Sequence, residues 1–293
     1  MGHLKICSIS KSYGAKQVLD AIDFQVDSGE IYGFVGSNGA GKSTTMRIAM
    51  GLLEQDSGTV EINGEPITPA SRRTIGYMPE ERGLYAKDHV SRQLIFFAQM
   101  HGLSALQAKS NAEALMERLE ISQYANQNLE TLSLGNQQRV QLAASLVHDP
   151  NLLILDEPFS GLDPVAVATM SSLLEEQAQK GVAILFSSHQ LDLVQRISDR
   201  IGIISSGRLE VQGSVQELRS QGKTRYLVET AQRDWYPAGI TVFQENESTV
   251  IVEAPDESYS QKILQAALEA GPVETFQRYL PDLSELFHEV VRA

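Results

Sequence analysis

The hydrophobic pattern of residues 4–220 predicts short strands that alternate with helices. The segments LLILD (152–156) and VAILFSS (182–188) are continuous apolar runs, as expected for strands that are buried on both faces. Between them, VAVATMSSLLEEQAQ (165–179) has the apolar spacing of a helix. A strand, a helix and a second strand in this order predict a parallel sheet covered by helices, which is an α/β fold.

The same pattern extends toward the N-terminus. EIYGFVG (30–36) is a β-rich run that stops at a glycine, and KSTTMRIAMGLL (42–53) has a helical pattern that starts directly after the following turn. Residues 89–120 also carry helical periodicity, and we expect LIFFAQM (94–100) within them to belong to the core. Three further short strands are predicted at LKICSISKSY (4–13), AIDFQV (21–26) and TVEING (59–64).

The composition changes near residue 222, where LRSQGKTR (218–225) is polar and contains a glycine. We therefore place a domain boundary between residues 222 and 223. Residues 223–293 carry more acidic than basic side chains, and their pattern predicts a small α+β domain. Its predicted elements are strands at RYLVET, ITVFQ, STVIVEA and VETFQ, a helix at SYSQKILQAALEA, and a last helix after Pro281 at DLSELFHEVVRA.

Charge and cysteine content narrow the class of protein. The chain of 293 residues has a formal net charge of −13, which is a poor match to nucleic acid, and we expect no nucleic-acid partner. Cys7 is the single cysteine, so no disulfide can form within the chain and a reducing compartment is favoured. No apolar run approaches the ~18 residues of a spanning helix, and the N-terminus is too polar for a secretory signal. We expect a cytoplasmic protein that can still dock onto something in a membrane.

The glycine-rich stretch GFVGSNGAGKSTT (33–45) has the spacing of a phosphate-binding loop, with Gly36 and Gly41 followed by Lys42 and Ser43. Glycines let several backbone N–H groups point at phosphate oxygens, and the helix that follows presents its positive N-terminus. Lys42 can reach the β- and γ-phosphates, and the hydroxyl of Ser43 can bind Mg²⁺. The alternative is a turn that binds nothing, but a strand before it and a helix after it are the context that phosphate binding needs.

Two carboxylates, Asp156 and Glu157, follow the predicted buried strand 152–156. The carboxyl edge of a parallel sheet is where ligands bind. Asp156 suits the Mg²⁺ carboxylate of a nucleoside triphosphatase, and Glu157, one residue further, can polarise a water that attacks the γ-phosphate. Two acids in a turn that Pro158 ends are the plain structural alternative.

The glycine-rich loop with Lys42, together with Glu157, already forms a complete nucleotide site, so the turn at LSLGNQQ (132–138) is not needed for it. It precedes a helical run, so it presents a second positive helix N-terminus. We therefore expect it to bind the γ-phosphate of a nucleotide that a second copy of the chain holds, in a two-fold dimer.

Together these motifs resemble, in order, those of the nucleotide-binding subunits of ATP-binding cassette (ABC) transporters, over about residues 4–220. GSNGAGKST resembles the Walker A loop, LSLGNQQ the family signature, and LLILDEP Walker B with the catalytic glutamate. Further matches are SGLD (160–163) to the D-loop, His189 to the switch histidine, and Tyr13 to the aromatic residue that stacks on adenine, although taken alone a tyrosine and a histidine can be structural.

The resemblance implies a P-loop NTPase core with an antiparallel β subdomain, a helical subdomain at about 86–148, and a nucleotide-binding domain at 1–222. It implies ATP and Mg²⁺ as ligands, Glu157, His189 and Lys42 as catalytic residues, and Ser43, Asp156 and Glu80 as metal ligands. The nucleotide-binding residues that it implies are Tyr13, Gly36, Ser37, Asn38, Gly39, Ala40, Gly41, Lys42, Ser43, Thr44, Ser133, Gly135, Asn136, Gln137 and Asp163.

Two positions depart from the family pattern. In the signature, Leu134 stands where glycine is usual and Asn136 stands before Gln137, while Ser133 and Gly135 remain. Glu80, in IGYMPEERGLY (75–85), stands where a glutamine is usual, and its charge adds repulsion near phosphate. The segment PEERGLY (79–85) resembles the corresponding segment in a subgroup of exporter-type ATPases that carry a C-terminal accessory domain.

The resemblance therefore implies an ATPase subunit that dimerises around two ATP molecules and drives a separate membrane permease, an exporter, at the cytoplasmic face of the membrane. Contact with the permease is expected near Glu80–Tyr85 and the helical segment after them. One alternative is a soluble ATPase of the same superfamily in repair or translation, but the chain has one phosphate loop and no heptad array. The other is a regulatory module without turnover, which the presence of Glu157 and His189 disfavours.

Overall fold

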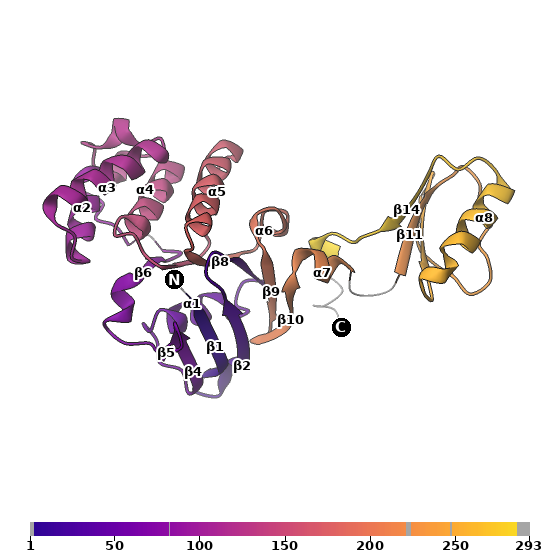
Figure 1. Cartoon of the computed structure of the whole chain (residues 1–293), viewed down its shortest axis with the longest axis horizontal. Coiled ribbons are helices and arrows are strands. Elements are labelled where there is room, and N and C mark those ends of the chain that lie inside the picture. The colour runs from indigo at the N-terminus through magenta and orange to yellow at the C-terminus, as the bar shows by residue number, and fades with distance from the viewer. Residues whose placement is uncertain (1–2, 82, 221–223, 247, 286–293) are drawn as a thin grey trace. The chain divides into compact units, whose positions relative to one another are not determined.

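The structure is a computed structural model that describes residues 3–81, 83–220, 224–246 and 248–285 (Figure 1). Residue contacts divide the chain into two compact units, Met1–Val215 and Gln216–Ala293. Within the described ranges, every helix is too short or too polar to cross a bilayer.

The first unit is built on a six-stranded sheet in the order β10-β9-β3-β8-β7-β6. The five strands from β6 to β9 in this order run parallel, and β10 pairs antiparallel with β9. Every residue of β3, β7 and β8 is buried, so the expected α/β fold with a parallel sheet is confirmed. The strands are β3 (Ile31–Val35), β6 (Ile75–Met78), β7 (Leu152–Leu155), β8 (Ala183–Ser188), β9 (Arg200–Ser205) and β10 (Arg208–Ser214).

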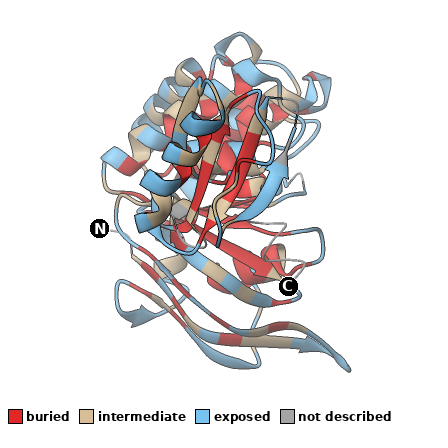
Figure 2. Ribbon diagram, turned by 90° about the vertical axis from the view of Figure 1, so that its right-hand side faces the viewer, coloured by how far each residue is buried: buried red, intermediate tan, exposed pale blue. Residues whose placement is uncertain are grey.

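A second, antiparallel sheet has the order β2-β1-β4-β5. Its inward side chains share one hydrophobic cluster with the central sheet and with helix α1 (Lys42–Ala49). The Phe24 ring stacks on Tyr32 and Phe34 of β3, with ring centroids 5.1 and 5.2 Å apart. Figure 2 shows the buried residues concentrated on the inner strands. The strands are β1 (Leu4–Tyr13), β2 (Lys16–Val26), β4 (Ser57–Ile62) and β5 (Glu65–Pro66).

Three helices that contact one another fall within residues 86–148: α2 (Val90–Met100), α3 (Ala105–Arg118) and α4 (Leu134–Leu146) (Figure 1). The bounds of a helical subdomain at 86–148 stay a prediction. α5 (Pro164–Gln179) connects β7 to β8 as expected, and α6 (Leu191–Ile197) follows β8. Short 3₁₀ segments lie at Ser71–Thr74, Ser122–Tyr124, Leu129–Thr131 and Glu257–Tyr259.

The sequence pattern did not predict β6, β9 or β10. β6 has only four residues, and a Cβ at its Gly76 would lie 2.1 Å from the carbonyl oxygen of Ser145, so this glycine is required by close packing against α4. β10 alternates between exposed and partly buried positions because it is an edge strand, which leaves a weak apolar signal.

The second unit contains a four-stranded sheet in the order β12-β13-β11-β14. β11 pairs antiparallel with both β13 and β14, and α8 connects β13 to β14, so the expected small α+β domain is present. Its elements are β11 (Thr224–Glu229), β12 (Thr241–Glu245), β13 (Thr249–Ala254), α8 (Ser260–Ala270) and β14 (Thr275–Tyr279).

Residue contacts divide the chain between residues 215 and 216, whereas the composition indicates a boundary between residues 222 and 223. α7 (Val215–Ser220) is tied to the second unit because the Arg219 guanidinium donates to the carbonyl oxygens of Pro281 and Leu280, at 2.9 and 3.2 Å. A boundary between residues 222 and 223 stays a prediction. Most of the helix expected after Pro281 lies outside the described residues, beyond residue 285.

Candidate functional site

Three neighbouring strands of the central sheet place their C-terminal loops at one edge. β3 leads into the glycine loop and Lys42, β7 into Asp156 and Glu157, and β8 into His189. β8 lies between β3 and β7 in a parallel register. The sequence segments from about 36, 156 and 189 therefore meet at the edge where ligands bind in parallel sheets.

Two glycines shape the loop after β3. A Cβ at Gly36 would lie 2.5 Å from the carbonyl oxygen of Ile204, so only glycine fits between the loop and β9. Gly41 has a φ of 114° and immediately precedes α1, which makes it a left-handed residue at the helix N-terminus. The backbone of the loop therefore curls directly onto the N–H groups of the first turn of α1.

Lys42 is buried, with 6% of its surface exposed, although it carries a charge. Its ammonium donates to the carbonyl oxygens of Gly36 and Ser37, at 2.8 and 3.3 Å. The same nitrogen lies 3.6 Å from a carboxylate oxygen of Glu157. The two loop carbonyls and the Glu157 carboxylate thus offset the charge of the Lys42 ammonium within the chain.

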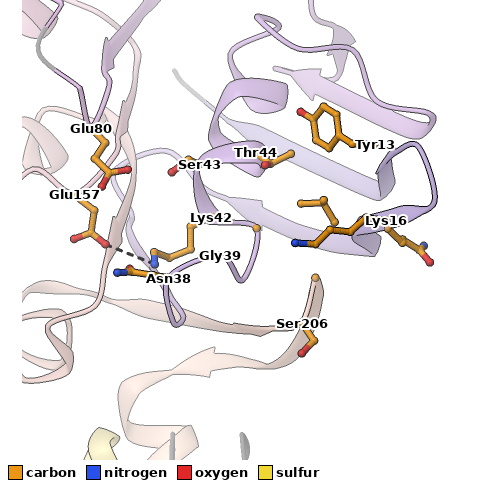
Figure 3. A pocket seen from close by; sticks show the side chains of 14 residues that line it. Tyr13, Lys16, Asn38, Gly39, Lys42, Ser43, Thr44, Glu80, Glu157 and Ser206 are labelled. Atoms are coloured by element: carbon orange, nitrogen blue, oxygen red, sulfur yellow. Dashed lines mark ion pairs between the residues drawn. The ribbon is translucent and has the colours of Figure 1, made fainter.

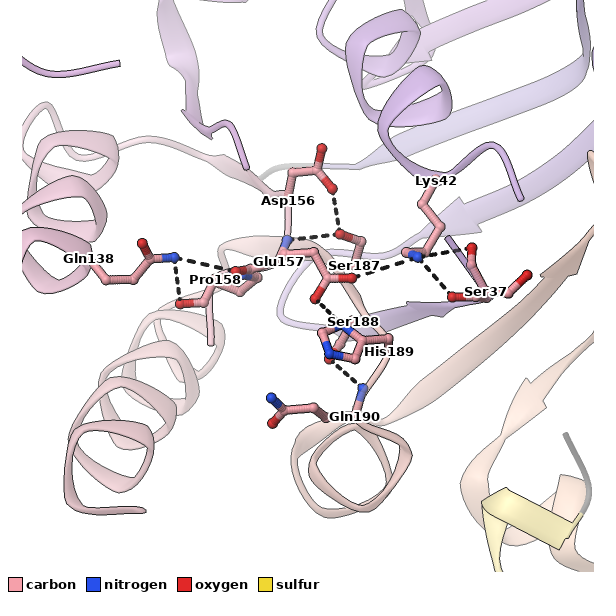
Figure 4. A network of polar contacts seen from close by, with 11 residues as sticks. Ser37, Lys42, Gln138, Asp156, Glu157, Pro158, Ser187, Ser188, His189 and Gln190 are labelled. Atoms are coloured by element: carbon pink, nitrogen blue, oxygen red, sulfur yellow. Dashed lines mark hydrogen bonds and ion pairs between the residues drawn. The ribbon is translucent and has the colours of Figure 1, made fainter. Parts of the chain in front are cut away.

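Glu157 is held by contacts from β8 (Figure 4). Its second carboxylate oxygen accepts a hydrogen bond from Nδ1 of His189 at 2.9 Å. The Ser187 hydroxyl accepts from the backbone N–H of Glu157 at 2.9 Å and donates to the Asp156 carboxylate at 2.6 Å. Glu157 has a φ of 51°, a conformation that non-glycine residues adopt at a cost and mostly at functional sites.

A pocket of about 770 Å³ lies over the glycine loop (Figure 3). Tyr13, with 53% of its surface exposed, stands at one end, and Glu80 and Glu157 stand at the other. The structure thus brings together nine of the expected site residues as pocket lining: Tyr13, Asn38, Gly39, Gly41, Lys42, Ser43, Thr44, Glu80 and Glu157.

Five further lining residues come from β2 and from the turn between β9 and β10: Lys16, Gln17, Val18, Ser206 and Gly207. The motifs did not indicate them, because their position depends on a tertiary contact. The backbone N–H of Asp20 donates to the carbonyl of Gly207 at 2.8 Å, which joins these two segments. The one local sequence signal for these residues is Gly207, a glycine in the turn that follows the apolar strand β9.

The oxygen atoms near Lys42 fit a hard divalent cation. Ser43 and Glu80 line the pocket, and Asp156 is buried beside it with one carboxylate oxygen bonded to Ser187. The described residues contain no cluster of three or more His, Cys, Asp or Glu side chains that could hold a metal ion. A cation here would therefore need phosphate oxygens as additional ligands, as is usual for Mg²⁺ at nucleotide sites.

The turn at Ser133 lies away from this pocket, and none of its residues is among those that line it. Ser133 is exposed and begins α4, and its hydroxyl accepts from the N–H of Asn136 at 3.4 Å. Gly135 and Asn136 are half-buried, whereas Gln137 is buried and donates to the carbonyl of Leu132 at 2.8 Å. The side chain of Gln137 therefore holds the turn in this chain instead of facing outward.

The remaining expected residues have mainly local contacts. Asp163 is exposed and caps α5, with its carboxylate accepting from the N–H of Ala166 at 2.8 Å. Ala40 is buried under the loop, and the Ser37 carbonyl accepts from Lys42.

Comparisons with known proteins agree with this geometry. Residues 19–160 match the family model for the ABC transporter, and residues 213–291 match the model for the ATP-binding protein DrrA1-3-like C-terminal domain. An uncharacterized ABC transporter ATP-binding protein of Bacillus subtilis, YhaQ, is 35% identical over 99% of this chain and 99% of its own length.

Two other similar proteins each cover about three quarters of this chain. The Nod factor export ATP-binding protein I of Burkholderia orbicola is 35% identical over 72% of this chain and 70% of its own length. A solved structure of the ATP-binding subunit of an ABC transporter has 33% identity and a TM-score of 0.70, and it covers 74% of this chain and 92% of its own. The chain therefore belongs to the ABC transporter ATP-binding proteins, a family of ATPases that drive transport.

Proposed function

We propose that the pocket over the glycine loop binds ATP and that Glu157 is the base in its hydrolysis. The network that joins Lys42, Glu157 and His189 at one end of the pocket carries this proposal. Tyr13 at the other end offers an aromatic face on which an adenine can stack. The distance between the two ends is then bridged by the ribose and the phosphates.

ATP binding requires Lys42 to exchange its present partners for phosphate oxygens. The N–H groups of the loop and of the first turn of α1 point at the same phosphates, and the helix N-terminus favours their negative charge. Ser43, Asp156 and Glu80 would hold Mg²⁺, whose charge would offset part of the negative charge of the phosphates. Once Lys42 binds phosphate, Glu157 is free to contact water.

Hydrolysis is an in-line displacement at the γ-phosphorus. The oxygen of a water molecule forms a bond to the γ-phosphorus while the bond to the bridging oxygen breaks, and ADP leaves with that electron pair. The proton of the water passes to the carboxylate of Glu157. His189 positions this carboxylate through its Nδ1 hydrogen bond, and Lys42 stabilises the negative charge of the transferring phosphoryl group.

The second half of each site comes from another copy of the chain or from a homologous ATPase subunit. Ser133 is exposed at the N-terminus of α4, where its hydroxyl and the N–H of Gly135 are available to a partner's nucleotide. Asp163, exposed at the start of α5, lies at the same interface. Two chains that face each other in this way hold two ATP molecules between them.

A membrane permease docks on a groove between β6 and the helices α2 and α4. The groove has a volume of about 230 Å³ and is mainly apolar, and the exposed residues Tyr85, Phe96 and Met100 extend the surface on α2 and before it. Its floor carries His148, whose burial lowers its pKa to about 4 and keeps the ring neutral. LIFFAQM thus belongs only in part to the core, because Phe96 is 44% and Met100 66% exposed.

Export is the direction that the relatives favour, since one of them is named for Nod factor export and the tail resembles the C-terminal domain of DrrA1-3-like proteins. The chain then works at the cytoplasmic face of the membrane. A role in repair or translation is not favoured by these relatives.

The test is ATP binding by Lys42→Ala. We expect the equilibrium dissociation constant of a fluorescent ATP analogue to rise about 100-fold or more, because charge-assisted hydrogen bonds to two phosphates are lost. Lys11→Ala is the control, because Lys11 lies outside the pocket and pairs with Asp56 at 2.8 Å. Normal ATP affinity in Lys42→Ala would contradict the proposal that this pocket binds ATP.

A further inference from the structure

Glu80 is the second carboxylate of the pocket, beside Glu157 (Figure 3). Figure 3 shows its carboxylate directed into the pocket, on the side of Ser43. Unlike Glu157, it makes no ion pair with any residue that the structure describes.

The backbone on both sides of Glu80 is fixed by hydrogen bonds to α4 and to the residue after β7. The side-chain amide of Gln141, on α4, donates to the carbonyl oxygens of Pro79 at 2.7 Å and of Glu81 at 3.3 Å. One step earlier, the carbonyl of Met78 accepts from the backbone N–H of Asp156 at 2.8 Å. Glu80 therefore belongs to a segment whose backbone is held against the site, and its exposed side chain lines the pocket.

The charges around the pocket balance before any ligand binds. Among the described residues that line it, Lys16 and Lys42 are cationic and Glu80 and Glu157 are anionic. Lys42 and Glu157 already face each other at 3.6 Å. A nucleoside triphosphate that enters without a cation brings about four further negative charges next to the unpaired carboxylate of Glu80, and like charges repel each other.

When a divalent cation accompanies the nucleotide, the Glu80 carboxylate favours nucleotide binding instead of opposing it. Carboxylate oxygens are preferred ligands of Mg²⁺, whereas a glutamine of the same shape offers a neutral oxygen. The Glu80 carboxylate therefore weakens the binding of metal-free nucleotide and strengthens the binding of the metal–nucleotide complex. A glutamine amide at this position has a smaller effect on both.

We propose that Glu80 makes nucleotide binding to this pocket conditional on a divalent cation, so that the chain selects the metal–nucleotide complex against metal-free nucleotide. This inference rests on the proposed function of the pocket. It assigns to one side chain a selectivity that neither the loop nor Lys42 provides, because both attract the phosphates whether or not a cation is bound.

The experiment compares Glu80→Gln with the unchanged chain in equilibrium titrations of a fluorescent, non-hydrolysable ATP analogue, once with Mg²⁺ and once with EDTA. The readout is the ratio of the dissociation constant in EDTA to that in Mg²⁺. We expect Glu80→Gln to lower this ratio by about tenfold or more, mostly through tighter binding in EDTA. Glu80→Ala removes the same charge and lowers the ratio as well.

Glu81→Gln is the matched control, since Glu81 is exposed, adjacent in sequence and not part of the pocket lining. It should keep the ratio of the unchanged chain. Ratios for Glu80→Gln and Glu80→Ala within about twofold of the unchanged chain overturn the inference while the proposed function stands. If the unchanged chain binds the analogue in neither condition, the proposed function falls and this inference falls with it.

Discussion

Two helix N-termini in this chain carry motifs for phosphate, and they differ in what surrounds them. α1 begins at Lys42, which is buried, bonded to its own loop and 3.6 Å from Glu157. α4 begins after Ser133, which is exposed and bonded only within its own turn. The first terminus faces a pocket that carboxylates after two other strands, Glu80 after β6 and Glu157 after β7, also line, and the second lies outside that pocket.

The difference indicates that a single chain forms the whole pocket around the loop before α1. The turn before α4 is exposed and can add its phosphate-binding groups only to another site. A helix N-terminus attracts an anion wherever it lies, but hydrolysis needs a base and a water beside the same phosphate. In the described structure only the loop before α1 has such groups nearby. In the proposed dimer, the α4 turn contributes to catalysis through a nucleotide that the other subunit holds.

The largest expected effect separates chemistry from binding at the first terminus. Glu157→Gln should lower the rate of ATP hydrolysis by about 10²- to 10⁴-fold, because the proton acceptor is lost while the shape of the side chain is kept. ATP binding should remain, and the ATP-bound dimer should accumulate in size-exclusion chromatography with ATP. Turnover near the normal rate would mean that another group acts as the base.

A smaller effect is expected at the second terminus. Ser133→Ala should lower turnover by about 10- to 100-fold, since one hydrogen bond to a charged phosphate is lost. Binding of ATP to the isolated chain at low protein concentration should not change, because Ser133 does not line the pocket. Weaker binding under those conditions would place Ser133 in its own chain's site.

Mixing the two impaired variants, Lys42→Ala and Ser133→Ala, tests whether the two helix N-termini act on one nucleotide from different chains. In a two-fold dimer of Lys42→Ala with Ser133→Ala, one composite site carries both changes and the other carries neither. An equimolar mixture should therefore recover up to about a quarter of the normal turnover, because half of the dimers are mixed and each has one intact site. No recovery would argue that Lys42 and Ser133 act on the same nucleotide from the same chain.

The smallest effect concerns the connection between the two regions. The side-chain amide of Gln138, on α4, donates to the carbonyl oxygens of Glu157 and Pro158, at 3.3 and 3.1 Å (Figure 4). Gln138→Ala should reduce turnover about threefold to tenfold with unchanged ATP affinity, because the loop that holds Glu157 in its left-handed conformation loses two neutral hydrogen bonds. A loss of ATP affinity instead of turnover would show that α4 supports the pocket and not the base.

Much of the fold and of the site could be predicted from local pattern. The buried strands β3, β7 and β8 are continuous apolar runs, and the residues that follow them are those whose chemistry stands out. Ligands bind at the carboxyl edge of a parallel sheet, so the strand pattern predicts that Asp156 and Glu157 lie there, whereas the role of His189 is implied by the family resemblance. β6 escaped prediction because its glycine is needed for packing and its four residues give little pattern.

The sequence by itself determined the chemistry of the loop, the base and the helix termini, because these depend on residue type and on spacing over a few positions. Only the tertiary structure decided that Glu80 lines the pocket without an ion pair to a described residue, that Lys16 and Ser206 line the same pocket, and that the Ser133 turn lies outside it. Those outcomes depend on which surfaces pack together between segments far apart in the chain, and packing of that kind leaves no periodic signal in the sequence.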